Sequence, residues 1–237
     1  MKPIAYESRM RQIALDIGLA TAPSFANFFA GPNQAVLMHL KLWTGSHLNP
    51  PVPTYLWGEP GCGKTHLLKA AAGALQSQGA RIGWLDAASI EPPEFHNAWT
   101  AIVLDQCHLY SAVQQQVAFN WFVNAVSSTH DHPCGVLAAG NVPPADLKLR
   151  DDLRSRLGWG HVYELQLLSE PERRGVLRAQ AEARGIFLSD EVIGFVLSRF
   201  SRDLSSLMHL LDQLDDYALQ AQRAITVPLL KAMLENQ

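Results

Sequence analysis

The sequence is short of the features that mark several protein classes. Its 237 residues include only 3 cysteines, Cys62, Cys107 and Cys134, and an odd number at scattered positions argues against both a disulfide framework and a metal cluster. No apolar run approaches the roughly 20 residues that cross a bilayer. The first residues, MKPIAYESRMRQ, lack the apolar core of a secretory signal. We therefore expect a cytoplasmic protein that has no membrane partner.

An excess of positive charge is also missing. The chain has 19 lysines and arginines against 22 aspartates and glutamates, a formal net charge of -3 at pH 7. Because proteins that grip nucleic acid directly usually carry a basic patch, any connection with DNA is expected to be indirect. His130, Asp131 and His132 could ligate a metal, but we favour a solvated loop ahead of Pro133.

What the sequence does have is enough apolar residues, 48%, to bury a substantial core. Short apolar runs alternate with helical patterns from about Pro23 onward. This alternation predicts an α/β protein with a five-stranded parallel sheet and flanking helices. The expected strands are PTYLW (53–57), RIGWLDA (81–87), AIVLD (101–105), GVLAAG (135–140) and HVYELQ (161–166).

The strands cease near Leu168, and only helical signals follow. Ser169 and Glu172 have the spacing of a capping box, which predicts a helix that ends near Arg184. Later helix signals are the caps at Ser189 and Thr226 and the apolar positions Leu204, Leu207, Leu211, Leu214 and Ala218. We expect an extended tail over residues 1–22, an α/β base over 23–167 and a small all-α lid over 168–237, with a nucleotide-sized crevice between base and lid.

A phosphate-binding loop is the clearest motif. GEPGCGKT, residues 58–65, satisfies G-x-x-x-x-G-K-[ST] between an expected strand and an expected helix. Its glycines let backbone amides turn toward a phosphate chain, Lys64 is expected to reach the terminal phosphates, and Thr65 is expected to hold Mg²⁺. The expected nucleotide-binding residues here are Gly58, Pro60, Gly61, Cys62, Gly63, Lys64, Thr65 and His66.

Polar residues at the ends of two later strands extend this site. Asp105 follows AIVL, at the place where phosphoryl-transfer sites put an acid that supports the metal. Asn141 follows GVLAAG, and it either orients a water or γ-phosphate or makes a turn before Val-Pro-Pro. Gln106 stands directly after Asp105, and its amide cannot accept the proton that an attacking water loses. Rapid hydrolysis in this pocket is therefore not expected.

Together these features resemble the AAA+ superfamily and, within it, the clade of the bacterial replication initiator DnaA. DDLRSRLGWGHVYELQ, residues 151–166, is similar to the segment that carries the clade's arginine finger, which puts the finger at Arg156, with Arg154 as the neighbouring alternative. FANFFAGPNQAV, residues 25–36, is similar to the stretch that lies against the nucleotide base. This likeness implies that Phe25 and Phe28 contact the base.

The rest of the chain narrows the resemblance to the Hda family of DnaA inactivators. No helix-turn-helix domain of the initiator type is expected after residue 237, and the lid sequence LDQLDDYALQAQRAITVPLLK has the family's pattern. QIALDI, residues 12–17, looks like the family's sliding-clamp-binding peptide, with Gln12, Leu15 and Ile17 as anchors. An ordinary edge strand or a disordered stub is the alternative for this hexapeptide.

Two departures from the clade concern the nucleotide. Aligning the lid by its apolar residues puts Ser205 where the clade has an arginine that faces the phosphates, and Arg202 lies one turn earlier as a candidate substitute. Together with Gln106, this favours bound ADP, or a purely structural nucleotide, over turnover. The resemblance implies ADP or ATP as cofactor, with Mg²⁺ held through Thr65 and Asp105.

The function implied by the resemblance is regulation of bacterial DNA replication initiation. Docked on the DNA-loaded sliding clamp, the beta subunit of DNA polymerase III, the nucleotide-bound protein is expected to present Arg156 to DnaA, stimulate its ATP hydrolysis and so inactivate it. We therefore expect a regulator more than an enzyme, and one that reaches DNA only through the clamp. Self-association is possible. The rival is a self-hydrolysing AAA+ ATPase of helicase-loader or transposition-helper type. The helical lid and the lack of acceptor-site acids disfavour a P-loop kinase.

Overall fold

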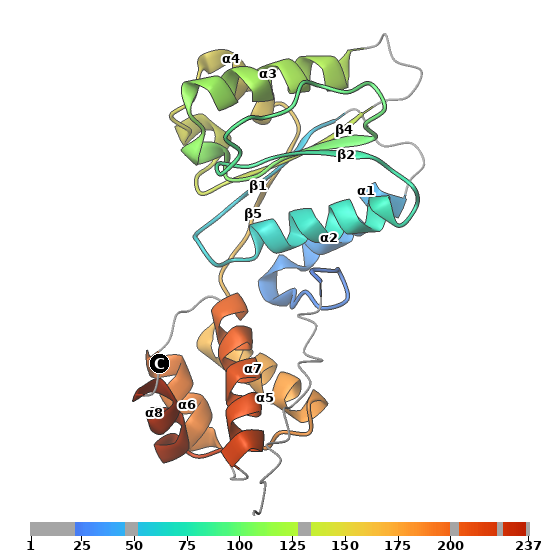
Figure 1. Ribbon diagram of the computed structural model, residues 1–237. Coiled ribbons are helices and arrows are strands. Elements are labelled where there is room, and N and C mark those ends of the chain that lie inside the picture. The colour runs from blue at the N-terminus through green and yellow to red at the C-terminus, as the bar shows by residue number, and fades with distance from the viewer. Residues whose placement is uncertain (1–21, 46–51, 128–133, 200–203, 222–224, 236–237) are drawn as a thin grey trace, which may run out of the picture.

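A computed structural model describes residues 22–45, 52–127, 134–199, 204–221 and 225–235. An α/β base lies above an all-helical lid in the view of Figure 1. The strands of the base are β1 (Thr54–Trp57), β2 (Ile82–Leu85), β3 (Ala101–Leu104), β4 (Gly135–Gly140) and β5 (His161–Glu164). Its longer helices are α1 (Gln34–Gly45), α2 (Lys64–Gln76), α3 (Ala112–Val126) and α4 (Asp151–Leu157), and the lid consists of α5 (Glu170–Ala183), α6 (Asp190–Arg199), α7 (Leu204–Ala221) and α8 (Val227–Glu235).

The sheet confirms all five predicted strands and their parallel arrangement. Its order is β2-β3-β4-β1-β5, so β1 is inserted between β4 and β5. Trp57 at the end of β1 is in register with Gly140 of β4 and Glu164 of β5. In a parallel sheet of this kind, ligands bind beyond the carboxyl ends of the strands. The residues after β1, β3 and β4 therefore meet along one edge.

Two apolar layers enclose the sheet. Helices α1 and α2 cover one face, and α3 and α4 cover the other (Figure 1). Every residue of β3 and β4 is buried, which explains why AIVL and GVLAAG are uninterrupted apolar runs. Within the residues that the structure describes, no helix is long and apolar enough to span a membrane.

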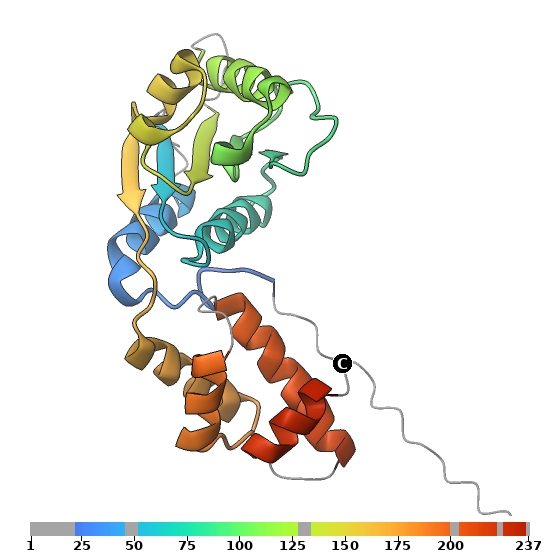
Figure 2. The ribbon, with the colours of Figure 1, turned by 90° about the vertical axis from the view of Figure 1, so that its left-hand side faces the viewer.

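The lid helices begin where the sequence predicts. The Ser169 side chain accepts a hydrogen bond from the backbone amide of Glu172, and the Glu172 carboxylate accepts one from the backbone amide of Ser169, so the expected capping box starts α5. Ser189 and Thr226 accept bonds from backbone amides at the starts of α6 and α8. Figure 2 shows the segment after β5 running from the base down to α5.

A cluster of aromatic rings ties α1 to the edge strand β5. The ring centroid of His39 lies 4.8 Å from that of His161 and 4.9 Å from that of Tyr163, and its Nε2 is 2.9 Å from Oγ1 of Thr54. Burial, followed by the charge of nearby His161, lowers the pKa of His39 from its ordinary 6.5. The folded protein therefore favours the neutral form of this imidazole.

The free energy of unfolding should fall as the pH drops below about 6.5, because the unfolded chain then binds a proton at His39 that the folded protein does not. His39→Gln keeps a polar group beside Thr54 and removes this titration, so the fall between about pH 7 and about pH 5 should shrink. Urea unfolding at each pH measures it. His209→Gln, on an exposed part of α7 away from this cluster, is the matched control for loss of a histidine. Equal pH dependence in both variants would contradict the assignment.

Candidate functional site

The phosphate-binding loop joins β1 to α2 in a conformation that requires glycine. Gly58, Gly61 and Gly63 have φ angles of 150°, 84° and 99°, a region that residues with side chains rarely adopt. A Cβ on Gly63 would lie 2.8 Å from Cε2 of Phe28, and one on Gly58 would lie 2.2 Å from the carbonyl oxygen of Leu165. The loop is therefore packed between the segment before α1 and the segment after β5.

Lys64 is the first residue of α2 and is 9% exposed. Its Nζ donates hydrogen bonds to the carbonyl oxygens of Gly58, at 2.7 Å, and Glu59, at 2.9 Å. The ammonium group also lies 3.6 Å from Sγ of Cys62. A positive charge is thus held inside the loop beside the N-terminus of α2. The ammonium group and the helix N-terminus both favour an anion at this place.

Thr65 and Asp105 meet as the sequence predicts. The Thr65 hydroxyl donates to Oδ2 of Asp105 at 2.7 Å, and the backbone amide of Gln106 donates to Oδ1 at 2.9 Å. Burial raises the pKa of the Asp105 carboxyl, while these two hydrogen bonds lower it. Mg²⁺ that accompanies a nucleotide fits this pair, since it uses one or two protein oxygens together with phosphate oxygens and water. No group of three or more metal-ligating side chains occurs in the described part of the chain.

Gln106 has an unusual backbone and an outward side chain. Its φ of 55° and ψ of 38° are left-handed, and among the described residues other than glycine it alone has a positive φ. This geometry lets its amide reach back to the Asp105 carboxylate, and it leaves the side chain exposed. Gln106 therefore positions Asp105 through the backbone, and its side chain gives no general base at the loop.

His108 belongs to the same neighbourhood and was missed in the sequence. Burial lowers the pKa of its imidazole, the charge of Lys64 lowers it further, and the charge of Asp105 raises it. Its Nδ1 is a buried atom without a hydrogen-bond partner. The signal in the sequence was the position of this histidine, three residues after the aspartate that follows the strand, which places it near the carboxyl end of the sheet. It could not be weighed because a 3-10 turn, Cys107–Leu109, decides where the ring goes.

The segment before α1 forms one wall of the loop. Phe28 packs on Gly63, and its ring centroid is 5.5 Å from that of His66, whose Nε2 lies 3.0 Å from the carbonyl oxygen of Ser24. Phe25 is half-buried against the core under α1 and α2. Phe25, Phe28 and His66 thus gather beside the loop, where their contact with a base stays a prediction.

Asn141 follows β4 directly and is half-buried. Because β4 lies between β3 and β1, the end of this strand lies between Asp105 and Gly58 in the sheet. The Tyr55 hydroxyl donates to the carbonyl oxygen of the next residue, Val142, at 2.9 Å and fixes the turn. The position suits the predicted role toward a phosphate without testing it.

Arg156, in the last turn of α4, lies on the opposite side of the sheet from the loop's helix. Its guanidinium carbon is 4.7 Å from the ring centroid of Phe119 on α3, and Nη1 donates to the carbonyl oxygen of Asp152 at 3.3 Å. The carboxylate of Asp152 pairs instead with Arg150, and that of Asp151 pairs with Arg154. Arg156 is thus held by an aromatic face and one carbonyl group rather than by an ion pair.

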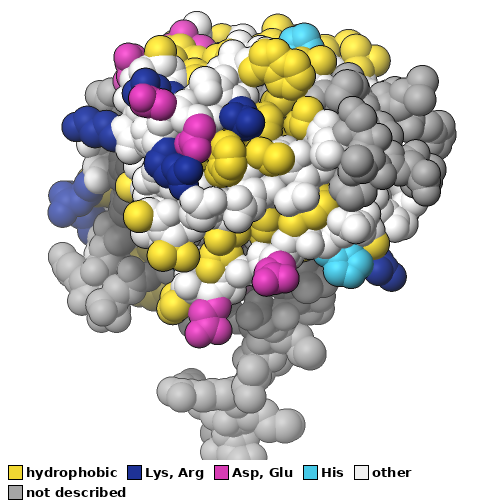
Figure 3. Space-filling model, turned by 90° about the horizontal axis from the view of Figure 1, so that it is seen from above, with side chains coloured by type: hydrophobic (Ala, Val, Ile, Leu, Met, Phe, Trp, Pro, Cys, Tyr) yellow, Lys and Arg dark blue, Asp and Glu magenta, His cyan; other side chains and the backbone are white. Residues whose placement is uncertain are grey.

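A cavity beside Arg156 is partly apolar and opens on the α3 side of the base. It has a volume of about 380 Å³ and is lined by Phe122, Val123, Val126, Ser127, Arg156 and Trp159. The Trp159 side chain is 61% exposed. Figure 3 looks onto this side, where apolar side chains lie among arginines and acidic residues. Such a mixture is typical of a surface that meets another protein.

Several predicted residues lie outside this description. Gln12, Leu15, Ile17, Arg202 and the sequence His130 to His132 fall outside the described residues. Ser205 is in the first turn of α7, but its side chain is not described. The crevice expected between base and lid also stays a prediction, since the two cavities described lie elsewhere in the base.

Comparison with known proteins identifies the fold of the chain and the type of its lid. Domain III of the Thermotoga maritima replication initiation protein DnaA is similar with a TM-score of 0.72 and 21% identity, over 91% of this chain and 97% of that one. The Hda lid domain family model matches residues 170–234. The lid is therefore of the Hda type, and the chain as a whole shares the fold of DnaA domain III.

Two further solved structures share this fold. AMPPCP-bound DnaA from Aquifex aeolicus has a TM-score of 0.66 at 21% identity, over 81% of this chain and 65% of that one. The Thermotoga maritima RuvB Holliday junction branch migration motor has a TM-score of 0.64 at 17% identity, over 90% and 72%. At these identities the likeness establishes the fold, and the lid sequence distinguishes the Hda type.

Gly63→Ala tests the geometry of the loop. It adds a Cβ that meets Phe28 and forces a residue with a side chain to a φ of 99°. We expect a loss of at least about 1–3 kcal/mol in the free energy of unfolding and weaker binding of a fluorescent ADP analogue. Gly73→Ala is the matched control, since its Cβ meets nothing within 4 Å in the helical interior of α2. That change should stabilise the protein by about 0.5–1 kcal/mol. Equal effects of the two variants would reject the assignment.

Proposed function

We propose that this protein regulates replication initiation by inactivating the initiator DnaA. In this proposal it binds ADP or ATP with Mg²⁺ in its own loop, docks on the sliding clamp through residues 12–17 and offers Arg156 to the ATP of DnaA. The ATP that is hydrolysed is the one bound to DnaA, not the nucleotide in this protein's own loop. The observation that carries the proposal is the combination of an Hda-type lid with a finger-position arginine that has no carboxylate partner among the described residues.

The geometry around Arg156 supports a role in trans. A guanidinium stabilises the charge that spreads over a phosphoryl group in the transition state, which accelerates hydrolysis by about 10³–10⁵ in comparable systems. The contacts of Arg156, a ring face and one carbonyl oxygen, are weak enough to exchange for a phosphate. The apolar cavity beside it offers a surface on which an initiator could seat.

The protein's own loop is suited to hold nucleotide more than to hydrolyse it. Lys64, Thr65 and Asp105 provide a cation, a hydroxyl and a carboxylate for a Mg²⁺-bound nucleotide. Next to Asp105, the exposed side chain of Gln106 cannot act as the general base that hydrolysis needs. We therefore expect weak or no turnover by the isolated protein, which we assign to the cytoplasm with DNA reached only through the clamp.

Arg156→Ala should lower the initiator's stimulated ATPase rate by about a thousandfold or more and leave clamp binding unchanged. Arg156→Lys should rescue little, because an ammonium lacks the planar fork of donors. Phosphate release from a mixture of this protein, clamp, DNA and ATP-bound DnaA measures the rate.

Arg154→Ala is the matched control for this arginine. Arg154 lies on the same helix and its pair with Asp151, at 2.8 Å, is exposed, so its loss should cost no more than about 1 kcal/mol. If Arg154→Ala abolishes stimulation and Arg156→Ala does not, the finger has been misassigned. Rapid ATP turnover by the protein alone would instead favour the self-hydrolysing ATPase.

The tail is tested separately. Replacing Gln12 and Leu15 together by Ala should abolish binding to immobilised sliding clamp, because both the directional amide and a central apolar anchor are lost. Ala14→Ser, within the same peptide, leaves the anchors in place and should bind normally. Normal affinity of the double variant would reject clamp docking through this segment.

A further inference from the structure

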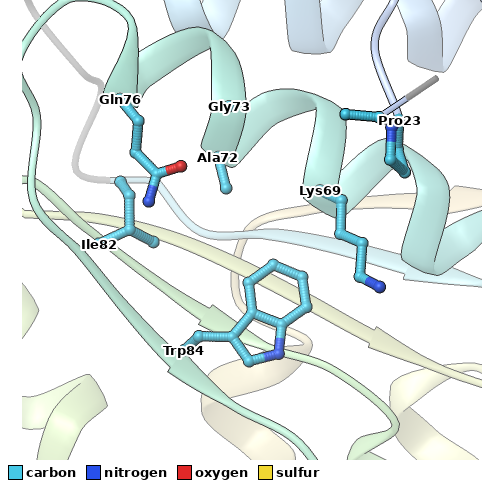
Figure 4. A pocket seen from close by; sticks show the side chains of 8 residues that line it. Pro23, Lys69, Ala72, Gly73, Gln76, Ile82 and Trp84 are labelled. Atoms are coloured by element: carbon cyan, nitrogen blue, oxygen red, sulfur yellow. The ribbon is translucent and has the colours of Figure 1, made fainter. Parts of the chain in front are cut away.

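A second cavity lies between α2 and the edge strand β2, away from the contacts that form the nucleotide loop (Figure 4). It has a volume of about 320 Å³, and we call it the α2–β2 cleft. Small and apolar residues form most of its wall, namely Ala72 and Gly73 of α2, Ile82 and Trp84 of β2, and Ala22 and Pro23 of the incoming chain.

Two polar side chains stand at opposite ends of this apolar wall. Figure 4 shows Lys69 on one side of the Trp84 indole and Gln76 on the other. The indole is held by a hydrogen bond from its Nε1 to Oδ2 of Asp86 at 3.3 Å. Within the described residues, Lys69 is exposed and forms no ion pair. The cleft therefore suits a short peptide that offers apolar side chains and one carboxylate.

The chain's own N-terminal segment has that chemistry. Residues 12–17 read QIALDI, so Leu15 and Ile17 flank the carboxylate of Asp16. The first described residue, Ala22, already lines the cleft, and the five steps from Ile17 to Ala22 span at most about 18 Å. A tether this short keeps the segment at an effective concentration in the millimolar range beside the cleft.

We propose that the α2–β2 cleft is the resting seat of residues 12–17. Asp16 pairs with Lys69, and Leu15 and Ile17 pack against the face of Trp84. The same apolar anchors are the ones that clamp docking needs, so seating and docking exclude each other. This competition rests on the proposed function, whereas the seat itself does not.

Disulfide trapping in the full-length chain tests the seat. Ala14→Cys leaves the anchors intact, and Gly73→Cys places a thiol in the cleft where a Cβ meets nothing within 4 Å. The three native cysteines are buried. Under mild oxidation the bond between positions 14 and 73 should form at least about tenfold faster than one to Gln78→Cys, because seating raises the local thiol concentration.

Position 78 is a matched control because it lies just beyond α2 but its side chain turns toward α1, where Nε2 of Gln78 donates to the carbonyl oxygen of Thr44 at 3.1 Å. A freely moving tail reaches both thiols, so equal rates for positions 73 and 78 would overturn the seat. Unfolding by urea confirms that both double variants are folded before the rates are compared.

Charge reversal tests the pairing. Lys69→Glu should slow the 14–73 bond about tenfold or more by repelling Asp16, and adding Asp16→Lys to that variant should restore the rate. No slowing, or slowing without restoration, would reject the pair. Added sliding clamp should suppress the bond in the parent pair. A fast bond that clamp leaves unchanged supports the seat and counts against clamp docking, which separates failure of the two proposals.

Discussion

The insertion of β1 between β4 and β5 is the constraint on which the site depends. Because β1 lies between β4 and β5, the loop that leaves it meets the ends of two other strands and the segment that leads to the lid. The carbonyl oxygen of Leu165 approaches so closely that Gly58 admits no side chain. One strand order therefore sets the phosphate loop, the carboxylate at Asp105 and the entry to the lid in fixed relation.

The two halves of the site differ in what holds their charged groups. Lys64 and Asp105 are buried, and each is satisfied by hydrogen bonds from or to the loop and its neighbours. Arg156 instead rests on the ring of Phe119 in a partly exposed place. A buried, satisfied group is expensive to move, whereas a cation on an aromatic face moves readily. This contrast is consistent with the proposed roles, in which the loop retains its nucleotide and Arg156 acts on a partner.

Much of this arrangement could be predicted from local sequence. Continuous apolar runs predicted the buried strands β3 and β4, the spacing of Ser169 and Glu172 predicted the start of α5, and GEPGCGKT predicted the loop. Each of these depends on residues close together in the chain.

The rest depends on packing between distant segments. The ring under Arg156 comes from α3, and the wall of the loop comes from Phe28, so no local pattern reveals either. The left-handed backbone at Gln106 belongs to the turn into Cys107–Leu109. Many different sequences form turns of this kind, so the sequence alone does not predict its backbone angles. Because of that turn, Gln106 acts through its backbone N–H, which donates to Asp105, and not through its side-chain amide.

The side chain of Asn33 fixes the segment after β5 to the rest of the base by a double hydrogen bond. Its Nδ2 donates to the carbonyl oxygen of Gln166 at 2.9 Å, and its Oδ1 accepts from the amide of the same residue at 2.8 Å. Asparagine thereby mimics a neighbouring strand and locks the first residues after β5 to the base. Two residues before Asn33, Gly31 has no side chain, which leaves room for Leu168 and Glu172 at the entry to the lid. The stretch of chain that carries Phe28, which packs on the nucleotide loop, thus continues directly into residues that contact the path to the lid, so a shift of one would be felt by the other.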